Sequence, residues 1–198
     1  MRVKTDAKRQ AIVAAAWEVF KKNGFERTTM SDISAQVGGS KATLYGYFDS
    51  KEQLFAAALE HIIQDQADQA FEGLMRPGDL KVRLADLAKG YLQARLTPEM
   101  IAVERALITE GERTDLGESM RLRFIQPHWR KLAGVLDQEM EAGRLRKADP
   151  MLATWHFRGM IEADLVERRL HGDATITAHE VERAITEGVS AFLRAYEP

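Results

Sequence analysis

The chain has 198 residues, of which 45% are hydrophobic, and it contains no cysteine. This composition supplies enough apolar side chains for a packed core and excludes a disordered protein, while the absence of cysteine excludes a disulfide framework and suits a reducing cytoplasm. The formal net charge of −2 argues against a nucleic-acid-binding protein unless the charges are unevenly distributed.

The charges are unevenly distributed along the chain. Residues 1–55 include nine Lys or Arg and six Asp or Glu, a net of +3, whereas the remaining 19 basic and 24 acidic residues give −5. The N-terminal end therefore suits a negatively charged partner. The longest apolar run near the start, residues 11–17, is too short to span a membrane and lacks the context of an export signal, so we expect a cytoplasmic protein without a membrane partner.

A helix is predicted over residues 5–23. Ile12, Ala16 and Phe20 repeat at helical spacing and form one apolar stripe. Gly24 is expected to end the helix, because glycine readily adopts the backbone conformation that follows a helix C-terminus.

Two shorter helices with a tight turn are predicted next. Thr29, with Asp32 three positions later, is expected to cap the first, which Gly38 ends, and Ser40 is expected to cap the second. In the second helix Leu44 is expected to face inward together with Phe48. The polar and aromatic side chains expected to face outward are Lys41, Thr43, Tyr45 and Tyr47. Such a surface suits DNA, although a solvated helical hairpin has the same pattern.

Residues 12–54 closely resemble the DNA-binding domain of TetR/AcrR-type transcriptional regulators. The motif residues are Gly24-Phe25, Thr28-Thr29, Ser40-Lys41, Thr43-Leu44-Tyr45, Tyr47-Phe48, Ser50-Lys51 and Leu54. The resemblance implies a double-stranded DNA operator as partner. The residues it assigns to DNA binding are Thr28, Thr29, Ser40, Lys41, Ala42, Thr43, Tyr45, Tyr47 and Lys51. Two glycines depart from the family pattern: Gly39 stands where a small apolar residue is usual and is expected to loosen the turn, and Gly46 stands where histidine is frequent.

The pattern stays helical beyond residue 50, without strands, repeats or low-complexity tracts. Pro127 is expected to kink a helix or to begin a new one. The expected helices cover residues 51–76, 80–92, 98–108, 116–143, 152–170 and 177–196. With the N-terminal helices this makes an all-α protein of about nine helices. We expect a helix-turn-helix domain over 1–50 and an effector-binding and dimerisation domain over 51–198. Within the latter, residues 110–159, with Gly143-x-Leu145 and Asp149-Pro150, are similar to the AefR-like group of TetR regulators.

The last two expected helices carry apolar or small residues on more than one face, so each needs two partners. The resemblance implies that the second partner is the same helix pair of another subunit, in a homodimer. The residues assigned to that interface are Leu152, Gly159, Ala163, Val166, Leu170, Val181, Ala184, Ile185, Gly188 and Phe192. Burial of both faces within a single bundle remains an alternative.

The resemblance also implies a small-molecule effector in the C-terminal domain. Residues that combine apolar area with polar tips are the candidates for its site, although each one alone is also typical of an ordinary core. These are Tyr91, Met100, Leu107, Phe124, Trp129, Trp155, His156 and Met160. The sequence does not identify the effector.

The predicted function is that of a TetR-type regulator, a repressor that binds an inverted-repeat operator as a dimer and is released by its effector. A DNA-binding regulator without a small-molecule effector is the alternative. A helical enzyme is a further alternative, but no nucleophile-elbow, dinucleotide or P-loop motif is present, and His179-Glu180-x-x-Arg183 lacks the second histidine of a zinc-binding motif. No cofactor or metal is expected.

Overall fold

The computed structural model describes residues 5–111 and 115–198, and every regular element in these ranges is helical. The expected all-α class is confirmed. None of the described helices has the length and hydropathy needed to cross a lipid bilayer. The chain divides into two compact units, Met1–Ile63 with Arg105–Met120, and Gln64–Glu104 with Arg121–Pro198.

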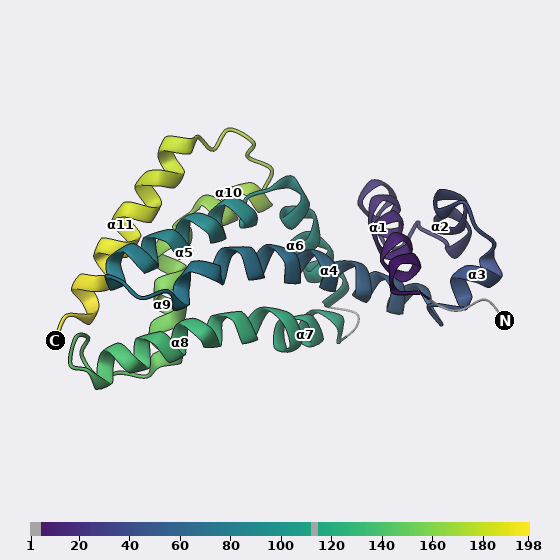
Figure 1. Cartoon of the computed structure of the whole chain (residues 1–198). Coiled ribbons are helices and arrows are strands. Elements are labelled where there is room, and N and C mark those ends of the chain that lie inside the picture. Colours follow the sequence, from purple (N-terminus) through teal and green to yellow (C-terminus); the bar gives the residue numbers. More distant parts are fainter. Residues whose placement is uncertain (1–4, 112–114) are drawn as a thin grey trace. The chain divides into compact units, whose positions relative to one another are not determined.

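The N-terminal unit begins with α1 (Asp6–Asn23), α2 (Met30–Val37) and α3 (Lys41–Tyr45), in agreement with the predicted helices (Figure 1). The predicted caps are present. The hydroxyl oxygens of Thr29 and Ser40 accept the backbone N–H groups of Asp32 and Thr43, and therefore satisfy N–H groups that have no partner within the helix.

The long helix α4 (Lys51–Phe71) begins within the N-terminal unit and continues beyond it. Its Phe55 ring lies 4.9 Å from the Phe20 ring and 4.7 Å from the Phe25 ring, measured between centroids. Because the start of α4 belongs to this aromatic core, the compact unit extends to Ile63 rather than ending at residue 50, where we expected the domain boundary.

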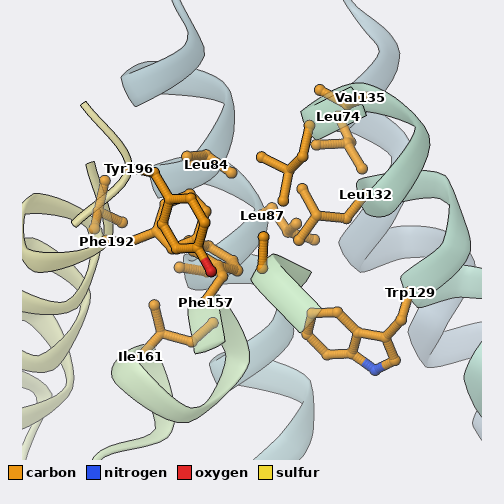
Figure 2. Close-up of a cluster of buried hydrophobic side chains, with 14 of the residues drawn as sticks. Leu74, Leu84, Leu87, Trp129, Leu132, Val135, Phe157, Ile161, Phe192 and Tyr196 are labelled. Atoms are coloured by element: carbon orange, nitrogen blue, oxygen red, sulfur yellow. The ribbon is translucent and has the colours of Figure 1, made fainter. Parts of the chain in front are cut away.

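Of the remaining elements, α7 (Leu116–Met120) belongs to the N-terminal unit, and the others belong wholly or partly to the C-terminal unit, whose core Figure 2 shows. In chain order the remaining elements are a 3₁₀ turn (Glu72–Met75), α5 (Leu80–Arg95), α6 (Pro98–Gly111), α7 (Leu116–Met120), a π-helical turn (Arg121–Ile125), α8 (Gln126–Glu141), α9 (Pro150–Glu162), α10 (Leu165–Leu170) and α11 (Ala178–Tyr196). In this unit α9 packs against both α8 and α11, and α11 also packs against α5 (Figure 1).

Helices α9 and α11 approach each other closely. The Phe157 and Phe192 rings pack edge to face with centroids 5.3 Å apart, and both side chains are fully buried (Figure 2). At Gly188 an added Cβ atom would lie only 2.6 Å from the backbone oxygen of Met160. Glycine at this position therefore allows the two helix backbones to come together within one subunit.

Two expected helices are interrupted. The helix expected over 116–143 has a π-helical turn before α8, and Pro127 lies in the first turn of α8, where its missing N–H costs nothing. The helix expected over 152–170 breaks at Ala163, which has φ 46° and ψ −121°. The sequence contains no glycine or proline at this break, so the apolar pattern alone predicted a continuous helix.

Ala163→Gly is expected to stabilise the protein. A non-glycine residue with positive φ costs roughly 1–3 kcal/mol, and the greater freedom of glycine in the unfolded chain offsets only about 0.5–1 kcal/mol of that gain. Thermal unfolding should therefore occur a few degrees higher. Ala14→Gly, at an exposed position within α1, is the matched control and should lower stability by about 1 kcal/mol. Equal losses in both variants would contradict strain at Ala163.

Two arginines bind the segment between α10 and α11: Arg169 donates to the Asp173 carbonyl over 2.9 Å, and Arg168 binds two carboxylates. Arg168 donates from Nε to Asp173 and from Nη1 to Glu180, each over 2.8 Å. Hydrogen bonds from Thr175, followed by those from Arg168, lower the pKa of Asp173 to about 2. The Thr177 N–H and Arg168 likewise lower the pKa of Glu180 to about 2. The ionised carboxylates therefore favour the folded state.

Glu180→Gln should lower the melting temperature at pH 7 and have less effect in acid. A carboxylate whose pKa is depressed in the folded state contributes stability above its unfolded pKa, and this contribution is lost as the pH falls from about 4.5 towards 2. Thermal melts from pH 7 to pH 3 should show the gap between variant and wild type narrowing. Glu187→Gln, exposed on the same helix, is the control and should show no such trend. A difference in melting temperature between Glu180→Gln and wild type that stays constant from pH 7 to pH 3 would exclude a contribution of the ionised Glu180 carboxylate to stability.

Candidate functional site

The turn between α2 and α3 is fixed by backbone conformation and by one buried hydroxyl. Gly38 adopts the left-handed conformation at φ 68° and ψ 35°. The Gly39 N–H donates to the Ser34 carbonyl over 3.2 Å, and the buried Ser34 hydroxyl donates back to the Gly39 carbonyl over 2.7 Å. Both polar groups of Gly39 are therefore bound, so the turn has more support than we expected from its two glycines. Ser34 is a residue that the sequence analysis missed.

Helix α3 presents an exposed polar and aromatic face. Lys41 and Ala42 are exposed, Thr43 is half-buried, and the Tyr45 side chain is 51% exposed. Leu44 is buried, as expected for the inward side of this helix. The arrangement leaves an ammonium group, a methyl group and a phenol free to meet a DNA groove.

Ser40 and Thr43 share their hydroxyl groups at the start of α3. Their oxygen atoms lie 2.9 Å apart, and the Ser40 oxygen also accepts the Thr43 N–H over 3.1 Å. Since one hydroxyl proton is used within the pair, the other remains available to a phosphate oxygen. This pair remains a predicted DNA contact.

The two threonines before α2 have different roles. Thr28 is buried and its hydroxyl donates to the Gly24 carbonyl over 2.7 Å, so it supports the turn after α1 instead of presenting a contact surface. Thr29 is exposed, but its hydroxyl donates to Asp32 over 2.7 Å and thereby lowers the pKa of that carboxyl. The sequence motif could not separate these roles, because burial depends on tertiary packing.

Tyr47 and Lys51 are also engaged within the unit. The Tyr47 hydroxyl accepts the Thr5 N–H over 3.3 Å and links the start of α1 to the residues after α3. The Lys51 ammonium donates to the Phe25 carbonyl over 2.9 Å and lies 4.1 Å from the centroid of the Phe25 ring. In this structure Lys51 therefore joins α4 to the turn after α1, whereas Lys41 is exposed on the surface of α3 and no described residue pairs with its ammonium group.

Lys41 and Lys51 offer a matched comparison, since each alanine variant removes one positive charge. Lys41→Ala should weaken DNA binding and reduce the salt dependence by about one counterion, with unchanged melting temperature. Lys51→Ala should lower stability by roughly 1–2 kcal/mol, because it removes a charged hydrogen bond and a cation–π contact. Tyr45→Ala should also weaken DNA binding without lowering the melting temperature, but it should leave the salt dependence unchanged because tyrosine carries no charge. Loss of folding or of the dimer in Lys41→Ala would assign Lys41 to structure instead.

Three of the residues predicted to bind an effector come together in the C-terminal unit. The Trp129 ring centroid lies 4.9 Å from that of Tyr91 and 6.0 Å from that of Trp155. Arg158 lies over all three rings and donates to Glu162 over 2.8 Å. The sequence analysis missed Arg158 and Glu162, although their i, i+4 spacing beside Trp155 could have indicated them.

Of the other predicted effector residues, Met160 packs against the core that includes Trp129. His156 is exposed and its Nδ1 lies 2.7 Å from the Tyr196 hydroxyl of α11, so its assignment to an effector site stays a prediction that this contact does not support. Leu107 belongs to the N-terminal unit. Phe124 is buried in the π-helical turn, and Met100 and Met160 are half-buried on α6 and α9. In the described ranges no group of His, Asp or Glu suits a metal ion.

The predicted dimer residues differ in exposure. Leu152, Gly159 and Ala163 are exposed, and they remain candidates for an interface. Val166, Gly188 and Phe192 are buried within one chain and offer little surface to a second subunit; Gly188 contacts α9 of its own chain. The half-buried residues are Leu170, Val181, Ala184 and Ile185. Val181 and Ile185 line a groove of about 770 Å³ that also includes Leu92 and Leu96.

The three N-terminal helices, the fixed turn and the exposed face of α3 define a helix-turn-helix DNA-binding protein. Comparison with known proteins identifies the family: the chain belongs to the TetR family. Residues 12–58 match the bacterial regulatory proteins of the tetR family, and residues 82–198 match the C-terminal domain of AefR-like transcriptional repressors. Members of this family are transcriptional regulators and not enzymes.

Similar proteins include the HTH-type transcriptional regulator BetI of Agrobacterium fabrum, 31% identical over 60% of this chain and 57% of BetI. The chain thus spans little more than half the length of this curated relative. A TetR-family regulator from Mesorhizobium loti has the same fold, with a TM-score of 0.88, 23% identity and full coverage of both chains. The flavonoid-responsive regulator FrrA has a TM-score of 0.79 and 30% identity, covering 98% of this chain and 99% of its own.

Proposed function

We propose that the chain is a repressor that binds an inverted-repeat operator as a homodimer and leaves it when a small molecule binds the C-terminal unit. The observation that carries the proposal is the exposed face of α3, on which Lys41, Ala42 and Tyr45 are presented by a helix with fixed caps. Two such helices related by a twofold axis would meet successive major grooves about 34 Å apart.

The homodimer is supported by one face of α9. Leu152, His156, Gly159 and Ala163 follow one another at helical spacing and are all exposed. Leu152 is 52% exposed and offers apolar area that a second subunit could cover. This face is separate from the one that Phe157 buries in the core.

Helix α4 is a suitable route from the effector to the DNA-binding domain, because it begins in one unit and ends in the other. Near its C-terminal end Asp68 lies 3.0 Å from Nε2 of the buried His128, whose Nδ1 lies 2.7 Å from the Phe124 carbonyl of the π-helical turn. A shift of α8 on ligand binding would therefore act on α4. A coupling free energy of about 1–3 kcal/mol would change operator affinity 5- to 150-fold.

A DNA-binding regulator without an effector is the second candidate. A fully satisfied core would favour it, since a protein without a ligand has no reason to bury an unpaired polar group. Arg95 Nη1 is buried without a hydrogen-bond partner in the part of the chain that the structure describes, and this observation favours the regulator with an effector. The relative named as flavonoid-responsive is consistent with it.

Salt-dependent titration of the purified protein against the DNA that flanks its own gene tests the proposal. We expect saturation at a discrete inverted repeat with two or four chains bound, and an affinity that falls steeply with salt. If binding to this DNA is weak, selection from a genomic library should still recover an inverted repeat. Failure of both to give a preferred site would contradict operator recognition. The variant Gly46→His, at an ordinary helical φ of −66°, shows whether the missing side chain limits affinity.

A further inference from the structure

A buried group of charged and aromatic side chains occupies the interior of the C-terminal unit. Helix α5 contributes Tyr91 and Arg95, α6 contributes Glu104, and α9 contributes Arg158 and Glu162. They form two sets of contacts: Arg95 Nη2 lies 3.3 Å from Glu104, while Arg158, over 2.8 Å, and Tyr91 both donate to Glu162. Removing a guanidinium from water is costly, so a purely structural group should leave no buried donor without a partner.

Arg158 meets this requirement. Its guanidinium donates to Glu162 and lies within 5.9 Å of the centroids of the Tyr91 and Trp155 rings and 5.6 Å from that of Trp129. Burial raises the pKa of the Tyr91 hydroxyl, so this group stays protonated and donates to Glu162. The aromatic faces therefore already have a cation beside them, which disfavours a cationic ligand at the same place.

Arg95 does not meet the requirement. The residue is only 6% exposed, and its Nη1 is buried without a hydrogen-bond partner among the described residues. Its partner Glu104 approaches Nη2 alone and is itself 30% exposed, so solvent weakens the pair. Two N–H donors on a permanently charged group thus face the interior unsatisfied.

We propose that Arg95 anchors the carboxylate of an aromatic effector, whose apolar part packs beside Tyr91, Trp129 and Trp155. An anionic oxygen is the acceptor that a buried guanidinium favours most, because the hydrogen bond is charge-assisted. This inference rests on the proposed effector control and adds the chemical class of the effector. It also assigns Arg95 as the residue that selects for an acid over its neutral analogue.

The test uses three probes of similar size: 3-phenylpropanoate, its neutral amide 3-phenylpropanamide, and 2-phenylethylammonium. Calorimetric titration of the full-length protein without DNA should show the acid binding at least tenfold more tightly than the amide, with the cation weakest. Arg95→Met should abolish the preference for the acid, so that acid and amide bind equally. Arg95→Lys should retain part of it, and Lys81→Met, exposed on the same helix, should behave like the wild type.

A second measurement separates a binding role from a structural one. If Arg95 serves to bind a ligand and does not stabilise the fold, Arg95→Met should leave the melting temperature of the ligand-free protein unchanged or raise it. Methionine fills the space without an unpaired donor. The proposal is overturned if Arg95→Met lowers the melting temperature by many degrees. It is also overturned if acid and amide bind the wild type equally, or if no probe binds. A preference for the acid that survives in Arg95→Met would overturn it as well, and would be expected if the probes bind instead in the groove lined by Leu92, Leu96, Val181 and Ile185.

DNA titrations with and without the acid distinguish this inference from the function on which it rests. Carboxylate binding that leaves operator affinity unchanged would retain the Arg95 site and contradict effector control. Operator binding by a protein that shows no preference for the acid would contradict the Arg95 site and leave the DNA-binding regulator intact.

Discussion

The close approach of α11 to α9 at Gly188 is the constraint on which the C-terminal unit depends. An added Cβ at Gly188 would lie 2.6 Å from the Met160 carbonyl oxygen, so any side chain would push the two helices apart. With α11 on one side and α8 on the other, α9 is held in a defined rotation about its own axis. Each of its faces is therefore given a different environment.

The three faces of α9 follow directly from that rotation. Ala153, Phe157 and Ile161 are buried in the core, which extends from Phe192 and Tyr196 on one side to Trp129 on the other (Figure 2). Trp155, Arg158 and Glu162 face Tyr91 and Trp129. Leu152, His156 and Gly159 are exposed. One short helix thus carries the core, the candidate effector site and the candidate dimer surface, and a change on one face is transmitted to the others by rigid packing.

In the N-terminal unit, α3 must be held in place by a domain whose hydrophobic core is small. Local hydrogen bonds fix both ends of the turn, through the Ser34 hydroxyl and the Ser40 cap. Contacts between residues distant in sequence then hold the helices together: Lys51 binds the turn after α1, and Tyr47 binds Thr5 at the start of α1. Several residues of the family motif therefore support the DNA-binding surface from inside rather than form it.

The sequence by itself determined the local structure of this protein and the identity of its N-terminal domain. Caps and helix ends depend on neighbouring residues, so the caps Thr29 and Ser40 were identified correctly. Only the tertiary structure decided which polar side chains are buried. Thr28 and Tyr45 belong to the same motif, yet one is enclosed and the other is exposed, because their neighbours come from different helices. The break at Ala163 and the unpaired donor of Arg95 likewise arise from packing between elements. The spacing of apolar residues within one helix does not predict such packing.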